Sequence, residues 1–416
     1  MSEYFDALET RSPEEREAAL FAALPGLLAH AKANAPGWAR ILADVDPADV
    51  RSREALARLP VTRKSELAEL QARERPFGGL VAAPLAKLAK VFASPGPIYE
   101  PEGHGRDWWR TARALWAAGF RAGDLVVNTF AYHFTPAGSM VEAGAAAIGC
   151  TVVPTGVGQT ELQVSTIRDL RANAFVGTPS FLKLILEKAD ELGADVSCLR
   201  KALVGAEYLP PALREQLRAR GLRVQQLYAT ADLGLLAYES ALADGTPTEG
   251  MILDEGLIVE IVRPGTGDPV PAGEVGEVVV TSFNRDYPLI RFATGDLSAV
   301  LPGTSPCGRT NTRIRGWLGR ADQTTKVRGM FVTPKQVAEI VRRFPEIARA
   351  RLVVEGEVGA DRMTLRCEVA APPEGLVERI VGAIRDVTKL RGEVQLVAPG
   401  SLPNDGKVIE DLRKYG

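Results

Sequence analysis

Two side chains late in the sequence have the types and settings needed for charge chemistry. Asp296 ends a Thr294-Gly295-Asp296 turn, and an ionised carboxylate there accepts hydrogen bonds without donating any. Lys407 follows Gly406 near the C-terminus, where a mobile ammonium can neutralise charge that builds up on a reacting group. Each also has an ordinary explanation, because Asp stabilises turns and Lys usually lies on the solvated surface. Their roles therefore depend on the elements that hold them.

The central part of the chain, residues 107–228, has the pattern of a parallel sheet. Short runs of β-forming residues alternate with helical patterns, as in crossover units. Thr178 offers a hydroxyl cap to a helix over residues 181–192, and Pro211 opens another. Ligands of such sheets bind beyond the carboxyl ends of the strands. The predicted strands cover residues 125–130, 151–153, 174–177, 201–204 and 224–228.

The rest of the chain predicts two further parts. After Glu249, alternating strands at residues 258–262 and 275–281 predict an antiparallel subdomain. Beyond Gly319, a helix capped by Thr333 and two short strands predict a small α+β domain. The last predicted helix places Leu376, Ile380, Ile384 and Val387 on one face. The expected fold class is α/β, with a large domain over residues 1–318 and a small one over residues 319–416.

Several short motifs occur in one order along the chain. Together they resemble the phenylacetate-CoA ligase family of adenylate-forming enzymes, from about residue 90 to the C-terminus. The resemblance implies that ATP activates a carboxylic acid to an acyl-adenylate, and that coenzyme A then takes the acyl group and releases AMP. The motifs are residues 155–161, Gly177-Thr178-Pro179-Ser180, Gly205-Ala206-Glu207, residues 287–297, Gly319-Arg320-Ala321-Asp322 and Leu402-Pro403-Asn404-Asp405-Gly406-Lys407.

The resemblance assigns roles to the charged residues of the late motifs. Asp296 would accept hydrogen bonds from both ribose hydroxyls, and Lys407 would contact the acid and the α-phosphate during adenylation. Asp322 would be the hinge about which the small, mobile domain turns between an adenylation pose and a thioester-forming pose. Arg320 would lie near the ribose and phosphates. An ordinary linker salt bridge is the alternative for Arg320 and Asp322.

The resemblance also places binding residues at the ends of central strands. Glu207 and Tyr228 end adjacent strands where the family binds adenine, although packing in the crevice would explain them as well. The family's acid pocket corresponds to Tyr132, His133 and Phe134, with Ala206 nearby, and their aromatic rings suit an aryl or arylacetic acid. His133 is given only a lining role, because a lone histidine among aromatics is usually a core residue.

One departure from the family concerns the phosphate loop. The family's loop is rich in Ser, Thr and Gly and ends in Lys-Pro, because N–H groups, hydroxyls and an ammonium hold the β- and γ-phosphates. The corresponding residues 93–101 contain no lysine, and Pro95 and Pro97 have no N–H to donate. Glu100 would repel a triphosphate. We therefore expect this loop to hold phosphate weakly.

A second departure lies just after the predicted strand that carries Tyr228. The family has Tyr-Gly-x-Ser/Thr-Glu, with a hydroxyl for the α-phosphate and a glutamate for magnesium. Here Asp232 keeps the metal-binding charge with shorter reach, and Thr230 would have to supply the hydroxyl in place of Ala231. Mg²⁺ at Asp232 is therefore predicted beside ATP and coenzyme A.

Composition excludes several other classes of function. The 416 residues include 50 Lys plus Arg against 52 Asp plus Glu, and this balance gives no field for nucleic acid or an anionic membrane. Four dispersed cysteines and an acidic N-terminus argue against structural zinc and a secretory signal, so a cytoplasmic location is expected. The apolar runs are too short to span a bilayer. A homodimer is left open.

Two alternatives to acyl-CoA synthesis remain at this point. One keeps adenylation but passes the acyl group to an amine or a carrier-protein thiol. The other is a degenerate homologue that binds a nucleotide or acyl-adenylate without catalysis, which the altered loop favours and the retained Asp296, Arg320 and Lys407 oppose. The sequence leaves the acid itself undetermined.

Overall fold

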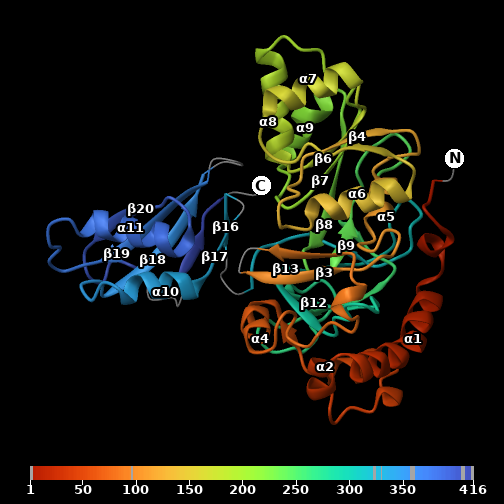
Figure 1. The fold of residues 1–416 in the computed structure, drawn as a ribbon, viewed down its shortest axis with the longest axis horizontal. Helices are drawn as coiled ribbons and strands as arrows, with labels where there is room; N and C mark the ends of the chain where they lie inside the picture. The colour runs from red at the N-terminus through yellow and green to blue at the C-terminus, as the bar shows by residue number, and fades with distance from the viewer. Residues whose placement is uncertain are drawn as a thin grey trace. The chain divides into compact units, whose positions relative to one another are not determined.

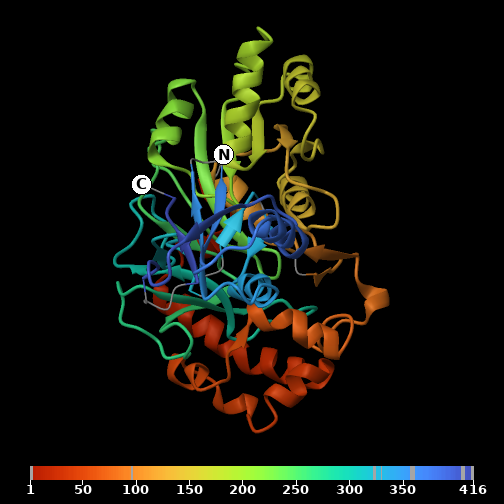
Figure 2. The same cartoon turned by 90° about the vertical axis from the view of Figure 1, so that its left-hand side faces the viewer.

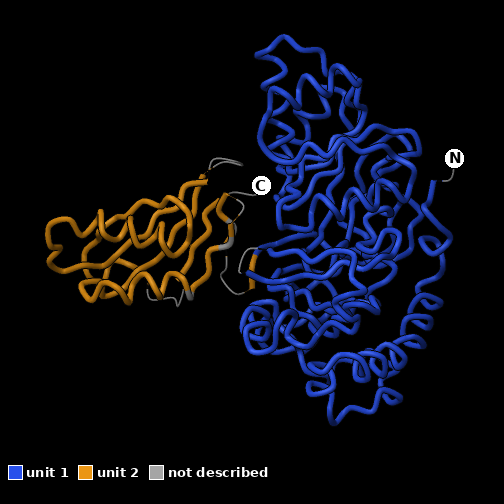
Figure 3. The backbone as a smooth tube through the Cα atoms, viewed as in Figure 1, with its two compact units in different colours: residues 1–319 blue, residues 320–416 orange. Residues whose placement is uncertain are grey.

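The computed structural model of this chain has two compact units, Met1–Gly319 and Arg320–Gly416 (Figure 3). Each unit has a hydrophobic core of its own. In the part of the chain that is described, no helix combines the length and apolar character needed to cross a bilayer. The described residues are 3–94, 97–321, 325–328, 330–356, 361–403 and 408–413.

The larger sheet of the first unit joins parallel strands to antiparallel ones, in the order β14-β15-β10-β9-β8-β7-β6-β4-β5. Neighbours from β5 to β8 are parallel, which confirms the predicted crossover units. The antiparallel part begins at β9, before Glu249, because the chain turns straight back after β8. The strands are β4 Leu125–Asn128, β5 Thr151–Val153, β6 Ala174–Gly177, β7 Lys201–Val204, β8 Arg223–Thr230, β9 Gly234–Tyr238, β10 Met251–Leu253, β14 Val300–Leu301 and β15 Arg313–Ile314.

Helices cover both faces of the parallel strands (Figures 1 and 2). Val126 and Val127 point to opposite faces of β4, as successive strand residues must. Val126 packs with α5 and α6, whereas Val127 packs with α7, α8 and α9. The predicted cap of α8 is confirmed, since Thr178 Oγ1 accepts from the N–H of Phe181 at 3.2 Å. The helices are α5 Thr111–Ala117, α6 Ala137–Ala147, α7 Thr160–Leu170, α8 Pro179–Glu191 and α9 Pro211–Ala219.

A second sheet in the first unit has the order β1-β13-β12-β11. Its antiparallel part agrees with the predicted strands, but β1 comes from near the N-terminus and runs parallel to β13. Side chains of the N-terminal helices, such as Leu24 and Trp38, share a core with Ile258 and Phe292 of this sheet. The elements are β1 Thr62–Arg63, β11 Leu257–Val262, β12 Gly276–Ser282, β13 Phe292–Ser298, α1 Pro13–Asn34, α2 Pro36–Ile41, α3 Arg53–Ala57 and α4 Leu67–Arg73.

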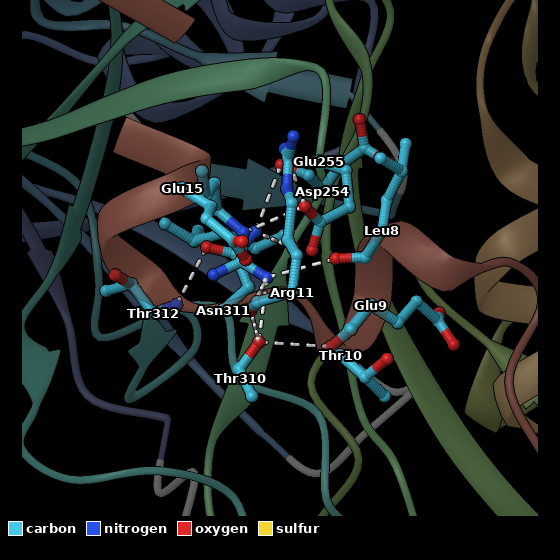
Figure 4. Close-up of polar contacts among 12 residues, drawn as sticks. Leu8, Glu9, Thr10, Arg11, Glu15, Asp254, Glu255, Thr310, Asn311 and Thr312 are labelled. Carbon is cyan, nitrogen blue, oxygen red and sulfur yellow. Dashed lines mark hydrogen bonds and ion pairs between the residues drawn. The ribbon is translucent and has the colours of Figure 1, made fainter. Parts of the chain in front are cut away.

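The segment before α1 is fastened to residues far along the chain (Figure 4). The N–H of Thr310 donates to the carbonyl of Glu9 at 3.0 Å. Arg16 donates through Nε to Glu255 at 2.8 Å and through Nη2 to the carbonyl of Leu8 at 3.1 Å. These buried contacts hold the N-terminal helices against the sheet that they cover, and so position β1.

The second unit packs α10 and α11 on a sheet of order β20-β19-β18-β21. Thr333 forms the predicted cap, since its hydroxyl accepts from the N–H of Gln336. Leu376, Ile380 and Ile384 lie buried on one face of α11, as the spacing predicted. The elements are α10 Pro334–Arg342, α11 Leu376–Thr388, β16 Thr325–Val327, β17 Met330–Val332, β18 Arg349–Glu355, β19 Arg362–Glu368, β20 Glu393–Val397 and β21 Ile409–Asp411.

Candidate active site

Asp296 on β13 and Tyr228 on β8 come together from the two sheets of the first unit. Asp296 is 8% exposed, and its Oδ2 accepts from the Tyr228 hydroxyl at 2.8 Å. Its Oδ1 accepts from the indole N–H of Trp317 at 3.1 Å. Both carboxylate oxygens are therefore oriented by neutral donors. The sequence predicted the two residues in one site but missed Trp317, whose only signal was its place just before Gly319.

The end of β7 carries two further predicted residues. Ala206 has a left-handed backbone with φ 63°, and both Ala206 and Glu207 are exposed. The Glu207 carboxylate accepts from the hydroxyl of Ser180 at 2.6 Å, at the start of α8. Since β7 and β8 are parallel neighbours, Glu207 and Tyr228 lie at the same edge of the sheet. Two of the central motifs are thus joined through a side-chain hydrogen bond.

The segment after β4 carries the three aromatic residues predicted for the acid pocket. Tyr132 is half-buried, and its hydroxyl accepts from Nδ2 of Asn128 at 2.8 Å. Burial raises the pKa of the Tyr132 hydroxyl. His133 and Phe134 are exposed instead, Phe134 to 78%. The carbonyl of Phe134 accepts from the N–H of Ala93 at 2.8 Å, which ties this segment to the phosphate-loop region.

The phosphate-loop region is a hairpin of β2 Lys90–Ser94 and β3 Ile98–Glu102. Ser94 pairs directly with Ile98, and Pro95 and Gly96 between them lie outside the described residues. Glu100 is 0% exposed, and its Oε1 accepts from the Ser94 hydroxyl at 2.6 Å. Burial, with the nearby Asp232, raises the pKa of the Glu100 carboxyl to about 8.

The state of Glu100 corrects one expectation from the sequence. We expected a charged Glu100 to repel a triphosphate. Its carboxyl is buried, and burial raises its pKa because ionisation in this position costs more than in water. Repulsion by Glu100 is therefore weaker than the sequence indicated.

Asp232 lies in the turn between β8 and β9, and its carboxylate is already in an ion pair with Lys64. Three buried oxygens near this pair have no hydrogen-bond partner among the described residues: Asp232 Oδ1, Glu100 Oε2 and the Tyr287 hydroxyl. Burial raises the pKa of the Tyr287 hydroxyl, and the nearby carboxylates of Asp232 and Glu100 raise it further. The Thr230 side chain bonds to the same turn, because its hydroxyl accepts from the backbone N–H of Leu233 at 3.2 Å.

Lys64, the ion-pair partner of Asp232, was not predicted from the sequence as a site residue. It lies 168 residues from Asp232 in the chain and outside every motif that carried the family resemblance. No local pattern marks it, because its place depends on how β1 pairs with β13.

Three further residues were predicted for the site from the late motifs, Arg320, Asp322 and Lys407. Arg320 is partly buried and belongs to the second unit. Asp322 and Lys407 lie outside the described residues. Among the described residues, no group of three or more His, Cys, Asp or Glu side chains is arranged to hold a metal ion. A single carboxylate such as Asp232 would need ligands from substrate or water.

Known proteins match this chain along nearly all of its length. The AMP-binding enzyme family matches residues 104–284. A phenylacetate-coenzyme A ligase of Thermus thermophilus is 31% identical over 99% of this chain and 100% of the relative. Another from Escherichia coli is 32% identical over 98% of this chain and 97% of the relative. The chain belongs to the phenylacetate-coenzyme A ligase family.

The fold agrees with that assignment. A crystal structure of a 2-hydroxyisobutyryl-CoA ligase in complex with 2-HIB-AMP and CoA matches with a TM-score of 0.85, at 25% identity, over 100% of this chain and 93% of the other. The α/β class predicted from the sequence is confirmed. As a member of the phenylacetate-coenzyme A ligase family, the protein is an AMP-forming acid ligase.

Proposed function

We propose that the protein activates a carboxylic acid with ATP and transfers the acyl group to coenzyme A with release of AMP. The observation that carries this proposal is Asp296, whose two oxygens are held by Tyr228 and Trp317. A carboxylate whose two oxygens are oriented by hydrogen-bond donors has a fixed direction, as an anchor for two ribose hydroxyls requires. Glu207 at the neighbouring strand end would face the adenine.

In the first half-reaction, a carboxylate oxygen of the acid attacks the α-phosphorus of ATP, and pyrophosphate leaves. In the second, the thiol of coenzyme A attacks the acyl carbonyl carbon and AMP leaves. The acid and the thiol are the nucleophiles, so the protein acts by positioning and charge neutralisation. Lys407 would neutralise the α-phosphate oxygens in the first step, with Thr230 and Arg320 nearby.

Asp232 is the proposed magnesium ligand. Its Oδ1 is buried and has no partner among the residues that the structure describes, and magnesium prefers carboxylate oxygens together with substrate phosphates and water. The residue present therefore fits the ion. When bound, magnesium would offset the charge of the β- and γ-phosphates, which the short β2–β3 hairpin has few groups to do.

We propose an aromatic or arylacetic acid as the substrate. Tyr132 and Phe134 flank His133 in the segment that resembles the family's acid pocket, and four curated relatives are named phenylacetate-coenzyme A ligases. The Tyr132 hydroxyl is fixed by Asn128, so its ring has a defined place beside Gly138. Ala206, at the end of β7, would form the opposite side.

The second unit is proposed to turn about Asp322 between the two half-reactions. A hinge residue must change its backbone angles, and proline fixes one of them. Asp322→Pro should therefore reduce the rate of thioester formation from a supplied acyl-adenylate by about tenfold or more. The rate of adenylation should fall less. Equal losses in both steps would contradict the hinge.

One observation favours a second candidate function. The direct pairing of Ser94 with Ile98 leaves a connection of three residues where the family needs a phosphate-holding loop. A protein with this hairpin could bind AMP or an acyl-adenylate made elsewhere and omit the ATP step. That reading predicts tight AMP binding together with weak ATP binding.

Acid-dependent exchange of labelled pyrophosphate into ATP separates these candidates. The measurement covers arylacetic, benzoic and short aliphatic acids, followed by mass spectrometry of acyl-CoA formed with coenzyme A present. We expect exchange and acyl-CoA with arylacetic acids. Exchange without acyl-CoA would identify another acceptor, such as an amine or carrier-protein thiol. Absence of exchange with every acid, in protein that still binds AMP, would establish the second candidate.

A further inference from the structure

We propose that Lys64 supplies the phosphate-binding ammonium that the β2–β3 hairpin lacks. It pairs with Asp232 in the ligand-free protein and transfers to phosphate oxygens when magnesium takes Asp232. The inference rests on the proposed use of ATP and names a residue outside the motifs that support it. Lys64 would touch the substrate directly, so it is proposed as a catalytic residue.

The register of the second sheet places Lys64 beside the nucleoside anchor. Thr62 pairs with Phe292 and Arg63 with Ala293 in a parallel ladder. Lys64 follows as the first residue of a short 3-10 helix, Lys64–Glu66, which packs against β13, the strand that carries Asp296. The Thr62 N–H also donates to the carbonyl of Arg291 at 3.1 Å, which supports the same register.

The ion pair places the other end of the side chain at the proposed metal ligand. The Lys64 ammonium contacts Asp232, in the turn that follows β8. β8 also carries Tyr228, which donates to Asp296. Lys64 thus starts a helix that packs on the strand of the proposed ribose anchor, and its ammonium reaches the proposed metal ligand. In a bound nucleotide, the phosphates run between the ribose and the metal, along the same path.

The exposure of the pair indicates which partner can exchange. The Asp232 side chain is 0% exposed, whereas that of Lys64 is 19% exposed. The ammonium therefore borders solvent, and the carboxylate lies behind it. Magnesium at Asp232 would replace one cation by another, and the released ammonium would meet the phosphates. At neither stage is a buried charge left without a partner, which would be strongly unfavourable.

A structural ion pair is the alternative explanation, and an adjacent residue provides a matched control. Arg63, the last residue of β1, directly precedes Lys64 and pairs with Glu277 at 2.9 Å. The side-chain exposures are similar, at 23% for Arg63 and 5% for Glu277. Arg63→Gln therefore removes a comparable ion pair whose carboxylate is not the proposed magnesium ligand.

The test is calorimetric affinity of the full chain for magnesium-ATP and for AMP, with thermal unfolding of each variant. Lys64→Gln should weaken ATP binding about 10- to 100-fold, the loss expected for one charge-assisted hydrogen bond, and change AMP binding less than about twofold. Lys64→Arg should restore most of the ATP affinity. Arg63→Gln should bind both nucleotides as the parent does.

The results that overturn the proposal are distinct from failure of the proposed function. Unchanged ATP affinity in Lys64→Gln, or equal losses for ATP and AMP with a lowered Tm, would show a structural ion pair. If Lys64→Gln does not fold, the double variant Lys64→Gln with Asp232→Asn is compared with Asp232→Asn alone, and equal ATP affinity of the two overturns the proposal. Failure of the ligase function appears instead in the parent protein, as absent pyrophosphate exchange.

Discussion

The proposed nucleoside end and the proposed phosphate end of the site each centre on a buried aspartate, and the two are held differently. Asp296 receives hydrogen bonds on both oxygens, from Tyr228 and Trp317. Asp232 has an ammonium on one oxygen, and its other oxygen has no partner among the described residues. The two donors fix the direction of the Asp296 carboxylate, whereas a cation that binds Asp232 must displace the lysine. On the proposed roles, the nucleoside end is preorganised and the phosphate end rearranges on binding.

Two buried tyrosines, one near each aspartate, differ in the same way as the aspartates do. Tyr228 and Tyr287 are both buried, but only Tyr228 has a hydroxyl bonded to the site's carboxylate. The Tyr287 hydroxyl has no partner among the described residues. An unsatisfied buried hydroxyl lowers stability, so the phosphate end holds polar groups that a ligand or water could still satisfy.

The largest effect is expected from Lys407→Ala, because Lys407 is proposed to contact the α-phosphate during adenylation. Loss of this charge-neutralising contact should lower the rate of acyl-adenylate formation on the order of 10²-fold or more. Thioester formation from a supplied acyl-adenylate should be largely retained. Single-turnover assays of each half-reaction provide the measurement. Parental rates of pyrophosphate exchange in the variant would remove Lys407 from the mechanism.

Asp296→Asn tests the preorganised end and should lower affinity for AMP and ATP alike, by about 10- to 100-fold. The amide cannot accept from Tyr228, Trp317 and two ribose hydroxyls at once, since it has one oxygen. Calorimetry with both nucleotides gives the comparison. A selective loss of ATP affinity would place Asp296 at the phosphate end and break the contrast.

Asp232→Asn tests the exchangeable end. ATP affinity should lose its dependence on magnesium and fall about tenfold, because a neutral amide binds the ion poorly. AMP affinity should remain within about twofold of the parent, since AMP has no β- and γ-phosphates. Titrations with and without magnesium chloride measure both effects. Magnesium dependence equal to that of the parent would exclude Asp232 as the ligand.

The smallest effect comes from removing one hydroxyl at each end. Tyr228→Phe should lower the free energy of unfolding by about 1 to 2 kcal/mol, because Asp296 loses a buried donor. Tyr287→Phe should leave it unchanged or raise it by about 1 kcal/mol, because the lost hydroxyl is unpaired. Urea unfolding of both variants supplies the values. Equal destabilisation would mean that the Tyr287 hydroxyl is satisfied in solution.

Local patterns in the sequence were sufficient for much of the fold and for the family. The Thr178 and Thr333 caps, the parallel strands and the buried face of α11 agree with the structure. These features arise within a few residues, where side-chain alternation and capping act directly. The family resemblance, rather than a local pattern, implied one nucleotide site for Asp296 and Tyr228, which the structure joins by a hydrogen bond.

Only the tertiary structure decided how the phosphate end is charged. Lys64 meets Asp232 because β1 pairs with β13 after the chain has folded back, and no local pattern encodes that register. The pKa of Glu100 is raised because the hairpin buries its carboxyl, whereas the sequence alone indicated a charged group. Charge state and ion pairing depend on burial and on neighbours distant in the chain, so they are properties of the folded protein rather than of any motif.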